Sequence, residues 1–382
     1  MFTDLITRIL PKIICRLLYR ESYQFGFLIH PRDTIDLIKR FSWVRFLPKK
    51  IVLIFLRFMW PVTISEINGL VDINGKKLKG IIIATPLSPK QMMENRNLAK
   101  RKIISAIRFA KKRGVKLVGL GGLTSSLTRG GIDILPFVDV KITTGHACTV
   151  YSVSKNVLQV IETFEFKKEQ VVLGIVGGAG SIGSNTAKYL VKQGIKNLIL
   201  LDLTRKQDQL RKIYHELKKI NQGCDIQISD NLNKLKDANI IVAATNAPEA
   251  VIKYEYLRGG TIIVNDAQPS DVDPDIILNK DDILVIEGGL LRAPYLYYNF
   301  NFRLQNKKDI FSCLAEVLVL AYLNKWNENF NVGRLRLENI NLIENTLPLI
   351  NLSISEFQNI DRIISLDEID QIKKINKKHG SN

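Results

Sequence analysis

Cysteine and histidine are scarce in this sequence, and neither is clustered. Its 382 residues include four cysteines and four histidines, without any Cys-x-x-Cys pair. Zinc sites need closely spaced ligands of these types, so the sequence predicts no metal centre. Scattered cysteines are also typical of a reducing compartment, which favours a cytoplasmic protein.

Long apolar runs are lacking as well. The run IVLIFLRFMW at 51–60 has nine apolar residues in ten, but Arg57 interrupts it and Pro61 follows it. A helix needs about 20 apolar residues to cross a bilayer, so this run is too short. The N-terminal MFTDLITRILPKIICRLLYR interrupts its apolar positions with Arg and Lys, so a signal peptide is not expected.

The segment 1–66 is both apolar and basic, and two interpretations of it stay open. It either lies in a membrane interface, as a peripheral contact with the inner membrane, or forms a helix buried against the rest of the protein. In the first interpretation the interfacial anchors are Trp43, Trp60, Lys49 and Lys50.

Acidic residues are outnumbered by basic ones. There are 55 Lys and Arg against 37 Asp and Glu, a net charge of +18. This balance indicates an acidic partner, such as a nucleotide, an anionic membrane or an acidic carrier protein. Nucleic acid is not expected, because no helix-turn-helix, RNA-recognition or zinc-finger signature is present.

Apolar strand-like runs alternate with helical patterns along most of the chain. This alternation predicts an α/β fold: a doubly wound parallel Rossmann sheet with a second, smaller α/β domain and C-terminal helices. One long helical stretch is expected after Ser88, a good N-cap, and before Gly114. The expected parts are an apolar, basic N-terminal segment (1–66), a substrate α/β domain (67–165), a Rossmann domain (166–300) and a helical region (301–382).

The strongest motif is GAGSIG at 178–183, which follows an apolar strand and opens an amphipathic helix. Gly178 permits the tight turn, Gly180 lets the backbone approach a pyrophosphate, and Gly183 lets the helix pack closely. The free N–H groups at the start of the helix then bind the phosphates. The predicted cofactor-binding residues here and at the ends of later strands are Gly178, Gly180, Ser181, Ile182, Gly183, Ala244, Thr245 and Asp266.

The residues after the next strand leave the choice between NAD and NADP open. Asp202 ends that strand, 24 residues after Gly178, and an acid there usually binds both ribose hydroxyls of NAD. Arg205 and Lys206 follow three residues later, and such a pair clamps a 2′-phosphate. Asp202 and Arg205 are therefore both candidate cofactor-binding residues, with opposite implications.

Taken together, the motifs resemble those of the long-chain acyl-[acyl-carrier-protein] reductases of cyanobacteria. They are LGGLTSSLTRGG, TTGHACTVYSV, IVGGAGSIGSNTAKYL, NDAQPSDV, IEGGLLR and DIFSCLAEVLVL, and the likeness spans roughly residues 25–380. The Rossmann part is also similar to shikimate dehydrogenase and glutamyl-tRNA reductase. The resemblance implies that a fatty acyl thioester of acyl carrier protein or coenzyme A is reduced to a fatty aldehyde. The implied cofactor is NADPH, with NADH as the alternative.

The resemblance also assigns residues. It carries the family's nucleophile to Cys313 and a cofactor-binding arginine to Arg205. The chain departs from the family at Cys148, where histidine is expected, and His146 lies two residues earlier. His146 is therefore a second catalytic candidate, as a group that assists the thiolate.

The residues around Cys313 give further expectations. A helix starting near 306–307 would place Cys313 nearly two turns in, where the helix dipole adds little. Glu316, at i+3, would raise the thiol pKa if it faced the sulfur. The candidate oxyanion donors are Thr143, Thr144 and the N–H of Gly145, and the basic stretch 100–113 is a candidate docking face for the acidic carrier.

Two other functions remain open from the sequence. One is a shikimate-type NAD(P)-dependent alcohol dehydrogenase, which needs no cysteine. The other is a non-catalytic, nucleotide-binding protein associated with a membrane.

Overall fold

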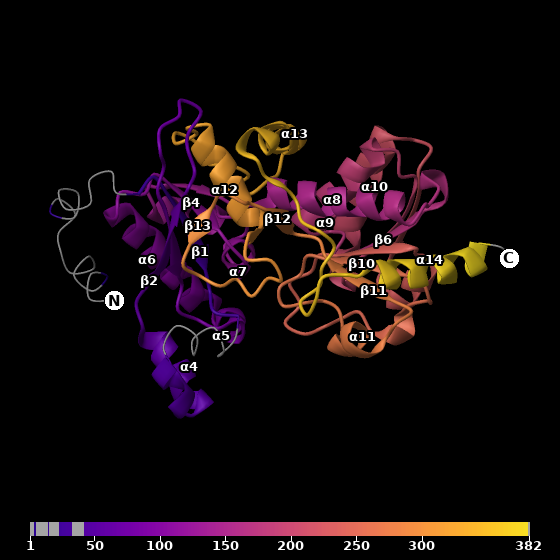
Figure 1. Ribbon diagram of the computed structural model, residues 1–382, viewed down its shortest axis with the longest axis horizontal. Helices are drawn as coiled ribbons and strands as arrows, with labels where there is room; N and C mark the ends of the chain where they lie inside the picture. The colour runs from indigo at the N-terminus through magenta and orange to yellow at the C-terminus, as the bar shows by residue number, and fades with distance from the viewer. Residues whose placement is uncertain (1–3, 5–13, 15–22, 33–41, 381–382) are drawn as a thin grey trace.

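The computed structural model describes residues 4, 14, 23–32 and 42–380, and the side chains of 42–43 and 379–380 are left aside. The described chain contains two six-stranded sheets and one small three-stranded sheet. Figure 1 shows the two large sheets at opposite ends of an elongated molecule, with α8, α9 and α12 between them.

The first sheet is mixed. Its four consecutive strands β3, β1, β4 and β5 are parallel, and β2 and β13 extend it in antiparallel pairing. In spatial order the strands are β13 (Tyr297–Tyr298), β2 (Val62–Asn68), β3 (Gly80–Ala84), β1 (Phe25–Ile29), β4 (Leu117–Leu120) and β5 (Lys141–Thr143).

The sheet does not respect the expected division of the chain at residue 66, because β2 crosses that position. β1 comes from the N-terminal segment, yet it lies inside the sheet between β3 and β4. Its residues Phe25, Phe27 and Leu28 are buried, which suits a strand covered on both faces. β13, the edge strand that pairs with β2, comes from the range 166–300 that was expected to form the Rossmann domain.

The second sheet is entirely parallel and confirms the predicted doubly wound fold. Its strand order is the 3-2-1-4-5-6 arrangement of Rossmann domains. In spatial order the strands are β8 (Asp225–Ser229), β7 (Asn197–Leu201), β6 (Val172–Val176), β9 (Ile240–Ala243), β10 (Ile262–Asn265) and β11 (Leu284–Glu287). The first sheet has as many strands, so the second α/β unit is not smaller in this respect.

Helices connect the strands and cover the sheets, with α9 and α10 on one side of the second sheet in Figure 1 and α11 on the other. The helices are α4 (Lys49–Phe58), α5 (Pro89–Glu94), α6 (Arg96–Lys112), α7 (Leu123–Ser126), α8 (His146–Thr163), α9 (Ser181–Lys192), α10 (Gln207–Ile220), α11 (Pro274–Asn279), α12 (Ser312–Tyr322), α13 (Leu337–Thr346) and α14 (Leu366–Gly380). Short 3-10 turns are η1 (Ser42–Phe46), η2 (Ile132–Phe137), η3 (Lys168–Gln170), η4 (Thr204–Lys206), η5 (Leu232–Asp237), η6 (Tyr254–Tyr256) and η7 (Pro348–Ile350).

The helical stretch after Ser88 begins as predicted. Ser88 forms a capping box with Gln91. The stretch is two helices and not one, because the side chain of Asn95 accepts a hydrogen bond from the N–H of Leu98 and starts α6 anew. No helix among the described residues is both long enough and apolar enough to span a bilayer.

The small sheet leads into the helix that joins the two halves. It consists of β14 (Asp309–Phe311), β12 (Leu290–Arg292) and β15 (Ser353–Ile354), all antiparallel. α12 follows β14 directly and is almost wholly apolar. It packs among the first sheet, α8 and α13, so it is buried on all sides and needs no polar face.

Candidate functional site

A cavity of about 490 Å³ lies between the two large sheets. The carboxyl ends of β1 and β4 border it from one sheet, and those of β9 and β10 from the other, which is where open α/β sheets bind ligands. The cavity brings together eight of the predicted residues. They are His146, Gly180, Ser181, Ile182, Ala244, Thr245, Asp266 and Cys313.

The glycine turn lies at one wall of this cavity. Its left-handed residue is Gly177, with φ of +86°, and a Cβ there would lie 2.5 Å from the carbonyl oxygen of Ala244. The prediction that Gly178 makes the tight turn is therefore wrong by one residue. Gly180 and Gly183 both leave room for this turn, because a Cβ at either position would lie within 3.0 Å of the Gly177 carbonyl oxygen.

The start of α9 fits a pyrophosphate. No side chain caps this helix, whose first residue is Ser181. The N–H groups of an uncapped first turn carry partial positive charge and have no partner inside the helix. Together with the room that Gly180 leaves, this geometry suits the phosphates of a dinucleotide.

Asp202 turns inward, toward the protein. Its carboxylate accepts hydrogen bonds from the N–H of Ala179 at 3.0 Å and of Leu203 at 2.9 Å, and Lys206 lies 3.4 Å away. Arg205 is exposed, and among the described residues no ion-pair partner of it is found. Asp202 therefore holds the glycine turn, while a cation remains exposed near the expected ribose position.

Cys313 lies in the first turn of α12, and not two turns in as expected. The reason is local. Residues 306–309 form a turn and 309–311 pair with β12, so the helix cannot begin before Ser312. The backbone N–H groups of Gly122, Leu314 and Cys313 itself are directed at the sulfur and favour its thiolate.

Burial opposes that effect. It raises the pKa of Cys313 to about 12, and the neighbouring carboxylate of Asp266 adds to the rise. The pKa of Asp266 is itself well above its usual range, because the group is buried near Glu287 and Asp271. The thiol is therefore protonated at neutral pH, mainly because it is buried, and Asp266 is the ionisable neighbour that adds to this effect.

The alkylation rate of Cys313 tests this electrostatic picture. Labelling by iodoacetamide should rise about tenfold for each pH unit between 7 and 10, because it follows the thiolate fraction. Asp266→Asn removes the carboxyl group whose negative charge, once it ionises, opposes the thiolate, and should move this profile to lower pH. Peptide mass spectrometry locates the label at residue 313. A rate that levels off below pH 9 would contradict the prediction.

Glu316 faces away from the sulfur and binds the start of α8. Its carboxylate accepts hydrogen bonds from the N–H groups of Gly145 (3.0 Å), Ala147 (2.8 Å) and Cys148 (3.0 Å). Thr143 and Asn331 donate to it as well. Burial raises the pKa of Glu316, and these hydrogen bonds oppose the rise.

This arrangement corrects the expected oxyanion donors. The hydroxyl of Thr143 and the N–H of Gly145 are both taken by Glu316, and Thr144 donates to the carbonyl of Asn331. Gly145 instead makes room for the nucleophile. A Cβ at this position, where φ is +79°, would lie 2.3 Å from the Cβ of Cys313.

His146 spans the cavity between the two halves of the protein. Its Nδ1 lies 3.0 Å from the hydroxyl of Ser181, and its Nε2 lies 3.0 Å from that of Ser125. Burial lowers the pKa of His146 to about 4, so the ring is neutral at pH 7. Both ring nitrogens are engaged by serines, so the expectation that His146 assists the thiolate finds no hydrogen bond to the sulfur.

An aromatic wall is the part of the cavity that the sequence analysis missed. Phe300, Phe302 and Phe311 line it, and successive ring centroids lie 5.0 and 5.7 Å apart in edge-to-face contact. Phe27 of β1 is far from these residues in the sequence but borders the same cavity. The aromatic-rich run YLYYNFNF at 295–302 is the signal that could have found it.

The expected basic docking face is partly neutralised. Lys100 pairs with Asp133, Lys111 with Asp139, and Arg113 with Asp4. These three basic side chains are therefore paired with carboxylates of the same chain. The stretch 100–113 is a weaker carrier-binding face than its sequence indicates.

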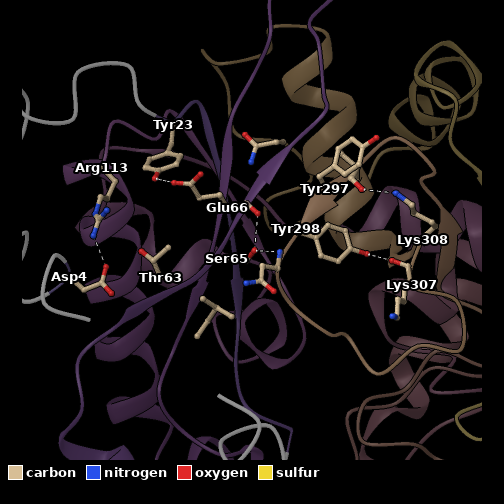
Figure 2. Close-up of a pocket in the computed structure, with 14 residues that line it drawn as sticks. Asp4, Tyr23, Thr63, Ser65, Glu66, Arg113, Tyr297, Tyr298, Lys307 and Lys308 are labelled. Atoms are coloured by element: carbon tan, nitrogen blue, oxygen red, sulfur yellow. Dashed lines mark hydrogen bonds and ion pairs between the residues drawn. The ribbon is translucent and has the colours of Figure 1, made fainter. Parts of the chain in front are cut away.

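A larger cavity, of about 840 Å³, borders β2 and β13 in the first sheet. Figure 2 shows that several of its polar groups bind one another. Tyr23 donates to Glu66 at 2.5 Å, and Arg113 lies 2.6 Å from Asp4. None of the predicted site residues lines it, so the cavity at Cys313 is the candidate active site.

The doubly wound sheet, its glycine turn and the cavity at its carboxyl edge define the class of protein. It is an oxidoreductase-type protein with a Rossmann domain for a nicotinamide dinucleotide. A family model described as shikimate / quinate 5-dehydrogenase matches residues 158–286, which covers most of the second sheet.

Comparison with curated proteins gives distant relatives. The chain is 28% identical over 332 residues to the aminotransferase PigE of a Serratia species, covering 83% of this chain but only 38% of that protein. It is 25% identical over 292 residues to the long-chain acyl-[acyl-carrier-protein] reductase of Synechococcus elongatus, covering 72% of this chain and 81% of that protein. Glutamyl-tRNA reductase of Caldivirga maquilingensis is 27% identical over 117 residues, 29% of this chain and 27% of that protein.

Proposed function

We propose that the protein reduces a long-chain fatty acyl thioester to a fatty aldehyde, with NADPH as reductant and a thioester on Cys313 as intermediate. The observation that carries the proposal is the position of Cys313. It lies at the start of a helix, in the cavity that the dinucleotide-binding turn also lines. The similarity to an acyl-[acyl-carrier-protein] reductase over 72% of the chain supports the same reaction.

The first half of the reaction is an exchange of thioesters. The thiolate of Cys313 attacks the acyl carbonyl carbon, the bond to the carrier's sulfur breaks, and the carrier thiol leaves with the proton that Cys313 lost. Nucleophile and leaving group are alike, so the exchange has a modest barrier. Asp266 borders the same cavity as Cys313 and is the ionisable neighbour that adds to its raised pKa, so we propose it as the group that accepts this proton.

The second half transfers two electrons to the acyl carbonyl. NADPH, bound at the start of α9, would supply a hydride to the carbonyl carbon, and the carbonyl oxygen would become an anion. The N–H groups of Gly122 and Leu314, which interact with the sulfur of Cys313, are the candidate donors for this charge. The C–S bond then breaks, so that the aldehyde leaves and the thiolate of Cys313 is restored. Overall, thioester, NADPH and one proton give aldehyde, free thiol and NADP⁺.

The walls of the cavity suit an acyl chain. Phe300, Phe302 and Phe311 face it together with Phe27 and Ile29 of β1. The rest of the lining is largely polar, so the aromatic wall is the part of the cavity that suits a hydrocarbon chain. The acyl carrier protein or coenzyme A portion would remain outside, since the cavity holds about 490 Å³.

His146 has a positioning role in this proposal. Its neutral ring links Ser125 of the first half to Ser181, the first residue of α9. It therefore couples the proposed phosphate-binding end of α9 to the half of the protein that contains the first sheet. In this proposal it takes no part in proton transfer at the sulfur.

Intact mass spectrometry tests the proposal. The full-length protein is mixed with a long-chain acyl carrier protein thioester in the absence of NADPH. The expected result is a mass increase of one acyl group, mapped to Cys313 by peptide analysis and lost on addition of NADPH as aldehyde appears. Absence of the adduct in the wild-type protein, or an adduct that persists in Cys313→Ser, would overturn the covalent mechanism.

A second candidate is an alcohol dehydrogenase of the shikimate type, favoured by the family model that matches residues 158–286. Such an enzyme needs no cysteine nucleophile. Hydroxy-acid oxidation that survives Cys313→Ala unchanged, without any acyl adduct, would select this function over thioester reduction.

Arg205 should decide the cofactor preference. The arginine is exposed beside the inward-turned Asp202, so it is free to bind a 2′-phosphate. A charge-assisted hydrogen bond of this kind is worth about 1.5–3 kcal/mol, so Arg205→Ser should raise the KM for NADPH by about tenfold or more. The KM for NADH should change little.

Steady-state kinetics with both cofactors measures this effect. Lys212→Ser, an equal loss of positive charge on an exposed face of α10, is the matched control. An unchanged KM for NADPH in Arg205→Ser would argue against NADPH as the preferred cofactor.

A further inference from the structure

Helix α4 has two apolar faces, and only one of them is buried among the residues that the structure describes. Val52 and Leu56 are buried against Val44, Met59 and the first sheet. The opposite face carries Ile51, Ile54, Phe55 and Phe58, whose spacing of i, i+3, i+4 and i+7 places them on one side of the helix. Ile54 is 58% exposed and Phe58 is 78% exposed.

The preceding turn extends this surface. Phe46, in η1, is 74% exposed and lies three residues before the start of α4. In Figure 1, α4 projects beyond the first sheet at the lower left of the molecule, away from the candidate active site. Together, Phe46, Ile51, Ile54, Phe55 and Phe58 form what we call the α4 surface. Soluble proteins rarely expose so many large apolar side chains in one place unless they bind something.

The charged residues within η1 and α4 have a single sign. Residues 42–60 contain Arg45, Lys49, Lys50 and Arg57, and no Asp or Glu. Lys50 and Arg57 are seven residues apart, so they lie on the same flank of the helix beside Ile54. This combination of exposed apolar side chains and a cationic flank complements an anionic lipid surface.

Further basic side chains follow in space. The chain leaves α4 through Trp60 and Pro61, which border a groove of about 760 Å³ along α6. Arg101 and Arg108 line the same groove and are exposed. Such a groove next to an apolar helix suits the phosphate headgroups of acidic phospholipids.

We propose that the α4 surface docks the protein onto the anionic face of a membrane, with α4 lying in the plane of the interface. The helix has ten residues and does not span the bilayer. Ile54 and Phe58 enter the boundary of the acyl chains, while Lys49, Lys50 and Arg57 contact phosphate groups. The proposal rests on α4, η1 and the neighbouring groove, and does not depend on the proposed thioester reduction.

Vesicle sedimentation of the full-length protein tests the proposal. The protein should co-sediment with vesicles of phosphatidylcholine and phosphatidylglycerol, less with phosphatidylcholine alone, and less again as NaCl is raised. The paired change Ile54→Asp and Phe58→Asp should lower the vesicle affinity by at least about tenfold, because it removes the buried apolar area. Lys49→Glu with Lys50→Glu should lower it by a similar factor, on anionic vesicles only.

Two controls separate docking from general effects. Lys236→Glu with Lys253→Glu changes the net charge equally on exposed residues of the second half, and Leu278→Asp changes an exposed apolar residue elsewhere. Both controls should sediment like the wild-type protein, and circular dichroism should show all variants folded. Wild-type protein that ignores anionic vesicles, or α4 variants that bind as tightly as the wild type, would overturn the proposal. So would α4 variants that only convert a dimer to a monomer, because a second copy of the chain would then be the occupant.

Discussion

Cys313→Ala is expected to lower kcat/KM for acyl-thioester reduction by at least about 1,000-fold, the usual scale for loss of a catalytic nucleophile. Without the sulfur no acyl group can be held in the cavity beside the dinucleotide. Alanine fills most of the same space at the start of α12, where Cys313 is only partly buried, so the fold should be retained. Aldehyde formation from a long-chain acyl carrier protein thioester is the measurement.

Binding of the dinucleotide separates loss of the nucleophile from loss of the site. The glycine turn and Asp202 do not contact residue 313 through any hydrogen bond, so the Kd for NADPH should stay within about twofold of the wild-type value. Cys224→Ala, a buried cysteine near the start of β8, is the matched control and should keep its activity. Cys313→Ala with activity near wild type would remove the proposed mechanism and leave only the dinucleotide-binding fold.

Glu316→Ala is expected to destabilise the protein by about 3–5 kcal/mol, because it leaves several buried donors without an acceptor. The carboxylate binds three N–H groups in the first turn of α8, together with Thr143 and Asn331. It therefore acts as the N-cap of a helix 168–171 residues earlier in the chain. Loss of this cap also releases Gly145, which packs directly against Cys313.

Chemical denaturation of the variants measures the free energy of unfolding. Glu316→Gln retains one acceptor oxygen and should lose about 1–2 kcal/mol, less than the alanine variant. Glu338→Ala, an exposed glutamate on α13, should stay within about 0.5 kcal/mol of the wild type. If Glu316→Ala were as stable as Glu338→Ala, the buried carboxylate would not be needed to hold α8 in place.

Much of the second sheet could be predicted from the sequence, because its signals are local. The apolar runs that form β6, β7, β9 and β10 each end in small or polar residues, and the glycine-rich turn follows β6 directly. Ser88 likewise caps its helix through residues three positions away. Interactions over so few residues leave a pattern that periodicity and capping rules can read.

Only part of the first sheet could be predicted in the same way: the apolar runs that form β3, β4 and β5 indicate strands, but those of β1, β2 and β13 do not. β1 is a short apolar run in a segment that is both apolar and basic, so a strand there cannot be told from a helix by its pattern. β13 has two residues and joins the sheet only because β2 offers an unpaired edge. The prediction that a helix begins at 306–307 is wrong because of another long-range contact. Pairing of β14 with β12 keeps residues 309–311 extended, so α12 begins only at Ser312.

The Rossmann unit, its dinucleotide turn and the candidate groups could all be identified from local sequence patterns, because each depends on neighbours along the chain. The tertiary structure decided what those groups do. It placed Cys313 in the first turn of α12, directed Glu316 away from the sulfur toward α8, and engaged both nitrogens of His146 with serines from different halves. These outcomes depend on contacts between residues far apart in the chain, which form only when both sheets pack around α12 and bury the groups in one cavity.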